Sequence, residues 1–155
     1  MRIDEVNPYG PTSREAIAKF EAKWKVMLPE DYKAFLLCSN GGVPIPNEIR
    51  VPTWEHQGTV VDFFYGIHDG PRFRLERAVD VYADRIPGDL IPIAADTFGN
   101  VLCIGWKGRR QGKIYFWDHE DELDENGLFV QDYRNVFLVA NSLQEFLDNL
   151  EELED

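Results

Sequence analysis

The pattern of hydrophobic and polar positions is most regular in residues 28–42, which read LPEDYKAFLLCSNGG. Tyr32, Phe35 and Leu36 recur at helical spacing, so they form an apolar stripe that needs a packing partner. Pro29 suits the first helical position, because its missing N–H has no intrahelical partner there. The glycine pair that closes the segment reaches the left-handed conformation that ends helices. The pattern therefore predicts a short helix with a clear beginning and end.

A second helical pattern precedes this segment. Ile17, Phe20 and Trp24 have the spacing that places side chains on one face of a helix. Thr12 is the expected N-cap, and Glu15 three residues later completes a capping box. Because only a short link separates the two helices, we expect a helix pair that turns its aromatic faces toward a common core.

The pattern changes after the glycine pair. Residues 43–52, VPIPNEIRVP, contain three prolines, which favour an edge strand or an extended loop because proline cannot donate to a strand ladder. Residues 59–67, TVVDFFYGI, are rich in β-branched and aromatic residues and predict a strand. Residues 75–85 predict a third helix, since Pro87 and Gly88 follow as stop signals.

The second half of the chain predicts a meander of strands. Short apolar runs indicate strands at residues 90–96, 101–106, 113–119, 128–133 and 136–140. A turn is expected at Phe98-Gly99-Asn100, with Asp96 accepting its N–H bonds. The last run could also lead into a final helix, which Ser142 caps and Glu145 completes as a second capping box.

The composition indicates one acidic domain. A chain of 155 residues has the length of a single domain, and we expect residues 1–155 to fold as one. The formal net charge is −12, which repels nucleic acid and anionic membrane surfaces. The same charge would accelerate association with a basic partner protein. The alternative is that the acidity serves solubility only.

The sequence predicts neither a membrane span nor a disulfide. No apolar run approaches the ~18 residues that a membrane-spanning helix needs. Cys38 and Cys103 both lie in apolar sequence, where we expect buried, inert thiols. Two lone cysteines give no disulfide framework and no metal-ligand spacing. A soluble protein of a reducing compartment follows, most simply the cytoplasm.

Three blocks of the chain resemble the SUKH superfamily, which includes the yeast Smi/Knr cell-wall-synthesis regulators and many bacterial proteins. The first is residues 28–42, similar to a family helix that ends in an NGG turn. The second joins residues 91–106, IPIAADTFGNVLCIGW, to residues 113–120, KIYFWDHE, and is similar to the family's strand, D-x-x-GN turn, strand and following strand. The third is residues 139–150, VANSLQEFLDNL, similar to the family's closing helix. The blocks occur in the family's order.

The resemblance implies a fold and a role. The fold is α+β, a single domain in which a central antiparallel or mixed sheet is flanked by the N-terminal helix pair and a C-terminal helix. No enzymatic activity and no cofactor are implied. Bacterial members are proposed to be immunity proteins that bind and neutralise partner toxins, whereas eukaryotic members are regulators that act by binding. We therefore expect a non-enzymatic immunity protein, with a regulatory scaffold as the alternative.

The candidate catalytic and metal-binding residues also have structural interpretations. Asp118 and His119 are residue types that suit a zinc, manganese or iron site. Neighbours on a strand point to opposite faces, however, so we expect the two to cap a turn and pack in the sheet. His56 or His68 could pair with a cysteine as base and nucleophile, although no flanking signature supports this. A small metal-dependent hydrolase is therefore the third and least favoured class of function.

The predicted partner-binding residues are one tryptophan and a run of carboxylates. Trp54, in a proline-bounded loop, is expected to be an exposed aromatic anchor. The carboxylates are Glu120, Asp121, Glu122, Asp124 and Glu125. We hypothesise that this face docks on a basic toxin domain and occludes its active site. If the toxin is a nuclease, the face would compete with its nucleic-acid substrate.

Overall fold

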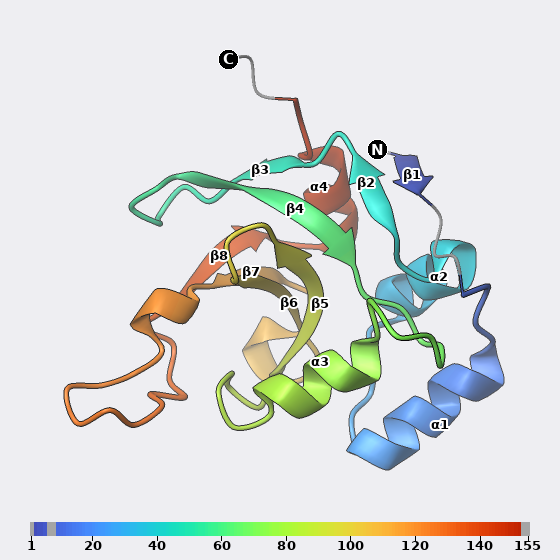
Figure 1. The fold of residues 1–155 in the computed structure, drawn as a ribbon, viewed down its shortest axis with the longest axis horizontal. Helices are drawn as coiled ribbons and strands as arrows, with labels where there is room; N and C mark the ends of the chain where they lie inside the picture. The colour runs from blue at the N-terminus through green and yellow to red at the C-terminus, as the bar shows by residue number, and fades with distance from the viewer. Residues whose placement is uncertain (1, 6–8, 153–155) are drawn as a thin grey trace.

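A six-stranded antiparallel sheet organises the computed structural model, which describes residues 2–5 and 9–152 (Figure 1). Neighbouring strands of the sheet follow one another in the chain. They are β3 (Glu48–Arg50), β4 (Gly58–Phe64), β5 (Leu90–Asp96), β6 (Val101–Gly105), β7 (Ile114–Trp117) and β8 (Val136–Ala140). A second sheet pairs β1 (Arg2–Glu5) with β2 (Val43–Ile45). Because each connection joins adjacent strands, the sheet is a meander, as the sequence predicts for the second half.

The helices flank this sheet, which confirms the predicted α+β fold. An N-terminal pair consists of α1 (Arg14–Trp24) and α2 (Glu30–Ser39), α3 (Leu75–Tyr82) lies between β4 and β5 in the chain, and α4 (Leu143–Asp148) closes it. Two short 3-10 helices, η1 (Gly108–Arg110) and η2 (His119–Asp121), lie in the loops on either side of β7.

The core has two parts because neighbouring residues of a strand face opposite sides of the sheet. Phe116 belongs to the larger cluster, which also takes the buried side chains of α1, α2 and α4. Trp117, the next residue, belongs to a smaller cluster on the other face, where Tyr82 of α3 packs against it. Residues of β6 are buried throughout, as expected for an apolar run at the centre of a sheet.

The C-terminal end of α2 is tied to the end of β4 and to the loop that follows it. Asn40 takes a left-handed conformation, and its buried side chain donates to the main-chain oxygens of Gly10 and Ile67 and accepts from the Ile67 N–H. Gly41 has a φ of +89°, and a Cβ there would lie 2.6 Å from the Phe64 oxygen. The predicted helix stop is therefore also a close packing contact that only glycine allows.

Several details differ from the sequence predictions; the strands predicted at residues 59–67 and 113–119, for example, end at Phe64 and Trp117. Thr12 is not the N-cap of α1, because the helix begins one residue later and the Ser13 hydroxyl accepts from the Ala16 N–H at 3.1 Å; Glu15 therefore completes no capping box. Residues 128–133 form no strand, since only an isolated bridge between Leu123 and Phe129 occurs there. The third helix ends at Tyr82, before the predicted residue 85.

The last helix begins where the sequence predicts. The Ser142 hydroxyl accepts from the Glu145 N–H at 3.0 Å, so Ser142 is the N-cap. The Glu145 carboxylate accepts from the Asn141 N–H at 2.9 Å, and Asn141 is the residue before the cap. Both contacts satisfy main-chain groups that the helix itself leaves unpaired.

Candidate functional site

Residues 119–134 connect β7 to β8 and form the most prominent loop of the molecule, called the acidic loop below. It projects from the body of the protein, drawn in orange in Figure 1. Leu123, Leu128 and Phe129 are exposed by 51%, 65% and 47%, respectively. Large apolar side chains that remain this exposed next to one another indicate a surface that binds something. The loop is therefore the candidate functional site.

The base of the loop is held by a buried carboxylate. Asp118 is 2% exposed, and its side chain accepts from the Trp54 indole N–H and from the Glu120 N–H, both at 3.0 Å. The Asn135 side chain donates to the Asp118 main-chain oxygen at 3.0 Å, which joins the two ends of the loop. Asp118 thus caps η2, and its predicted structural role is confirmed.

His119 ties the start of the loop to the β5–β6 turn. Its main-chain N–H donates to the Asn100 side chain at 3.0 Å, and its ring Nε2 lies 2.8 Å from the Phe98 main-chain oxygen. A carbonyl oxygen only accepts, so Nε2 carries the proton in this contact. The turn itself is held by Asp96, which accepts from the N–H groups of Phe98 and Asn100 at 2.8 Å. These contacts confirm the structural interpretations of His119 and Asp96.

The middle of the loop is anchored on the C-terminal side of α3 by Arg85. Its guanidinium donates to the Glu122 carboxylate at 2.7 and 2.9 Å. The same group lies over the rings of Tyr82, Trp117 and Phe129, with its central carbon 4.8 to 5.7 Å from the ring centroids. Arg85 therefore combines an ion pair with cation–π contacts at a partly buried position.

We expect Arg85→Ala to lower the free energy of unfolding by about 1–2 kcal/mol and to speed hydrogen exchange in the acidic loop. The variant would lose the ion pair with Glu122 and the cation–π contact with Phe129, which both attach the loop to Arg85. Arg85→Lys keeps the charge but not the planar fork, so it should give an intermediate result. Hydrogen exchange read by mass spectrometry, together with urea unfolding, measures both effects. Unchanged exchange in residues 119–134 would contradict this role for Arg85.

The far end of the loop is anchored by a second cluster. The Tyr133 hydroxyl donates to Asp89 at 2.8 Å, and the Arg110 guanidinium lies 3.4 Å from the centroid of the Tyr133 ring. Arg110 also lies 3.4 Å from Asp89. Burial and the hydrogen bond to Asp89 raise the pKa of Tyr133, so its hydroxyl remains a donor at neutral pH. The predictions did not assign a role to any of these three residues.

The five predicted carboxylates divide into two groups. Glu122 forms an ion pair with Arg85, and Asp124 accepts from the N–H groups of Asn126 and Leu128 at 2.8 and 3.0 Å. These two carboxylates shape the loop. The other three are exposed and make no side-chain ion pair with the described residues: Glu120, Asp121 and Glu125. Of the five predicted carboxylates, only these three are free to meet a partner.

Trp54 does not supply the exposed aromatic that the sequence predicts. It is 7% exposed, its ring lies 4.4 Å from that of Phe116 between centroids, and its indole N–H is used by Asp118. The tertiary fold turns the side chain inward because the sheet provides both an apolar contact and an acceptor for the N–H. Four of the eight exposed large apolar side chains of the described residues belong instead to the acidic loop, of which residues 128–133 were predicted to be a strand.

The cysteines and the remaining histidines do not form a catalytic pair. Cys38 is exposed, which corrects the prediction of a buried thiol, whereas Cys103 is fully buried and burial raises the pKa of its thiol. The His68 ring accepts from the Gly70 N–H at 3.0 Å, and burial lowers the pKa of His68. His56 lies 3.4 Å from its exposed neighbour Glu55. Within the described residues, neither cysteine hydrogen-bonds to a histidine.

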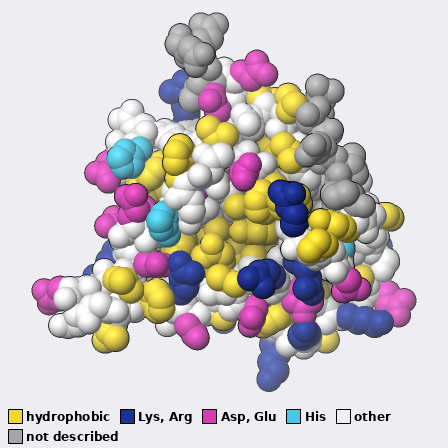
Figure 2. Space-filling view, viewed as in Figure 1, with side chains coloured by type: hydrophobic (Ala, Val, Ile, Leu, Met, Phe, Trp, Pro, Cys, Tyr) yellow, Lys and Arg dark blue, Asp and Glu magenta, His cyan; other side chains and the backbone are white. Residues whose placement is uncertain are grey.

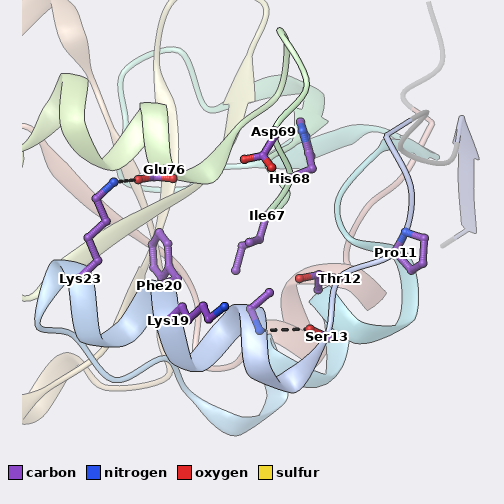
Figure 3. A pocket seen from close by; sticks show the side chains of 11 residues that line it. Pro11, Thr12, Ser13, Lys19, Phe20, Lys23, Ile67, His68, Asp69 and Glu76 are labelled. Atoms are coloured by element: carbon purple, nitrogen blue, oxygen red, sulfur yellow. Dashed lines mark hydrogen bonds and ion pairs between the residues drawn. The ribbon is translucent and has the colours of Figure 1, made fainter.

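A cleft of about 630 Å³ lies between α1 and the loop after β4 (Figure 3). Lys19 and Lys23 line it from the helix, and His68 and Asp69 line it from the loop. Lys23 is paired with Glu76 across the cleft. Because charges of both signs meet here and pair with each other, the cleft does not present a surface of one charge.

The described residues contain neither a metal-binding cluster nor a membrane-spanning helix. Within residues 2–5 and 9–152, no group of three or more His, Cys, Asp or Glu side chains is placed to hold a metal ion. In the same residues, every helix is too short or too polar to cross a bilayer.

Comparison with known proteins gives two matches. The model of the SMI1/KNR4 family (SUKH-1) matches residues 11–149. The SPbeta prophage-derived uncharacterized protein YokK of Bacillus subtilis (strain 168) is 30% identical over 154 residues, which cover 89% of this chain and 74% of that protein. The family match includes the acidic loop and all the residues that anchor it.

Proposed function

This chain belongs to the SMI1/KNR4 family (SUKH-1), and on that premise we propose that it is a non-enzymatic protein-binding module whose acidic loop docks on a basic partner protein. The finer role that we propose is immunity. The chain would bind a partner toxin in a defined stoichiometry and cover its active site, without chemistry of its own.

The main support for this proposal is the concentration of exposed apolar side chains in the acidic loop. The described residues include eight exposed large hydrophobic side chains, and four of them belong to the acidic loop: Leu123, Leu128, Phe129 and Tyr133. Apolar groups with a polar rim are the usual composition of a protein-binding surface. The carboxylates of Glu120, Asp121 and Glu125 supply that rim and give it one sign of charge.

The attachment of the loop supports a docking role as well. Both ends and the middle are held by side-chain contacts through Asp118, Arg85 and Tyr133, of which the first is buried and the second partly buried. A loop held in this way loses little conformational freedom when a partner binds, so more of the contact energy appears as affinity. The net charge of −12 would increase the rate at which a basic partner arrives.

The partner is what separates immunity from regulation. To test the proposal, the tagged chain is cross-linked in its native host and captured, and the captured protein is purified and rebound. We expect a basic protein that protects residues 119–134 from hydrogen exchange. Its association should slow about tenfold or more between ~0.05 and ~0.5 M salt.

Two outcomes then decide the role. Immunity requires that the captured protein is toxic to cells lacking this chain and harmless in cells that express it. A captured protein that is not toxic but protects the same loop would favour a regulatory scaffold. Protection confined to a surface outside the acidic loop would contradict the docking proposal.

A further inference from the structure

A groove of about 470 Å³ lies between β4 and α3, and no residue of the acidic loop lines it. Phe63 of β4 and Tyr65, which follows that strand, both line the groove, and Tyr65 also belongs to the larger core cluster. The face shown in Figure 2 has an apolar area at its centre that Lys and Arg side chains border. The volume lies in the range of sites that bind small molecules.

The charge of the groove is opposite to that of the protein. Arg72, Arg74 and Arg77 line it, and none of its lining residues is acidic, although the chain has 28 acidic residues. Arg74 is held in place, because its guanidinium donates to the His68 main-chain oxygen at 3.2 Å and lies 3.4 Å from Glu76. Arg72 and Arg77 are exposed and make no ion pair with the described residues. Two guanidinium groups thus remain available for an anion.

Aromatic rings form the floor of the groove. The ring centroids of Phe63 and Phe73 are 4.2 Å apart, and those of Phe63 and Tyr65 are 5.4 Å apart. Tyr65 lines the groove and is 7% exposed. Burial raises the pKa of Tyr65, so its hydroxyl keeps its proton and can donate.

The loop before α3 holds one of these rings in an unusual conformation. Phe73 has a φ of +62°, which is rare for a bulky side chain. The Gly66 N–H donates to the Phe73 oxygen and the Leu75 N–H donates to the Gly66 oxygen, both at 2.8 Å, so the conformation is fixed from two sides. Strained residues of this kind cluster at binding sites, where they place a side chain that relaxed backbone would not.

We propose that this groove binds a small ligand in which a phosphate group is attached to a flat ring, with the ring on Phe63 and Phe73 and the phosphate on Arg72 and Arg77. Arginine suits this role because its planar fork matches phosphate oxygens and its charge does not titrate. The flat ring would stack on the aromatic floor, as bases do on aromatic side chains. The proposal is independent of the partner that the acidic loop binds.

The test uses four probes on the full chain: phenyl phosphate, adenosine 5′-monophosphate, adenosine and inorganic phosphate. Binding is followed by calorimetry and by chemical-shift changes of the amides at residues 63–82. We expect a ring-bearing phosphate to bind about tenfold or more tightly than inorganic phosphate or adenosine, since both halves of the site must be filled. Tighter binding of adenosine 5′-monophosphate would identify a nucleotide as the source, and tighter binding of phenyl phosphate another aryl phosphate.

Arg72→Ala and Arg77→Ala should each weaken binding of the better probe about tenfold, because each removes a charge-assisted hydrogen bond to the phosphate. Both side chains are exposed, so the variants should retain the unfolding midpoint of the parent protein. Arg109→Ala is the matched control, since it removes an exposed arginine in η1, outside the groove. Absence of binding by every probe at ~1 mM, or affinities that Arg72→Ala and Arg77→Ala both leave unchanged, would overturn the proposal.

Discussion

Replacing Trp54 with alanine is expected to lower the free energy of unfolding by about 3–5 kcal/mol. The indole is 7% exposed and packs on Phe116, so its loss would leave a cavity in the main core. It would also remove the donor that Asp118 accepts at 3.0 Å, at a carboxylate that is 2% exposed. Asp118 would keep the Glu120 N–H on one oxygen, but its other oxygen would lose its donor and add a desolvation cost to that of the cavity. Urea unfolding at neutral pH measures the sum.

Trp54→Phe separates the two causes. Phenylalanine retains most of the apolar contact but has no N–H, so we expect a loss of about 1–3 kcal/mol from the Asp118 oxygen that loses its donor. Hydrogen exchange at the base of the acidic loop should also rise in this variant, because Asp118 caps η2. If Trp54→Ala were as stable as the parent protein, the buried position of the indole would be wrong and the sequence prediction of an exposed anchor would regain support.

Reversing the three free carboxylates should have the largest effect on partner binding. In the triple variant Glu120→Lys, Asp121→Lys and Glu125→Lys, the face that we propose for docking becomes basic. We expect its association with a basic partner to slow about 10- to 100-fold at low salt, with a smaller effect at high salt. The free energy of unfolding should change by less than about 1 kcal/mol, since all three side chains are exposed. Stopped-flow association kinetics measures the first effect and urea unfolding the second.

A matched variant controls for the change in net charge. Asp62, Asp69 and Glu152 are also exposed and lie outside the acidic loop, so their reversal to lysine changes the net charge equally. This control should slow association only slightly, because a local contact contributes more than a distant charge. Equal slowing by both triple variants would show that net charge acts without a defined docking face. No slowing by either would exclude a basic partner at this loop.

Glu122 and Asp124 are left unchanged in these variants for a structural reason. Glu122 is paired with Arg85, and Asp124 accepts two main-chain N–H groups at the tip of the loop. Their reversal would alter the shape of the loop as well as its charge, so a loss of binding would have two explanations. The sequence presents five similar carboxylates, and only the tertiary contacts distinguish those that shape the loop from those that are free.

Local chemistry made much of the fold predictable. The apolar run of residues 90–96 is β5 to the residue, and the cap of α4 is at Ser142 as predicted. In each case the deciding interaction lies within a few residues of the chain, as with the carboxylate of Asp96 and the turn that follows it. Interactions of this kind can be recognised from a sequence because spacing alone brings the groups together.

The candidate site depended on contacts between distant residues. Trp54 and Asp118 are 64 positions apart, and Arg85 and Glu122 are 37 apart. Residues 128–133 have the apolar content of a strand, but contacts with Arg85, Ala83 and Asp89 hold them as a loop whose apolar side chains face outward. The exposure of a side chain is a property of the whole packed molecule, so no pattern within the segment could reveal it.

The sequence by itself determined most of the segments that become helices and strands, the acidity of the protein and its resemblance to one family, because propensity, capping and charge are local or additive quantities. Only the tertiary structure decided which aromatic side chains are buried, which carboxylates remain free and where three arginines meet an aromatic floor. Those outcomes depend on the order in which the sheet brings remote strands together, and on the partners that each buried polar group finds there. Both proposals about binding therefore rest on the fold and would not follow from the composition.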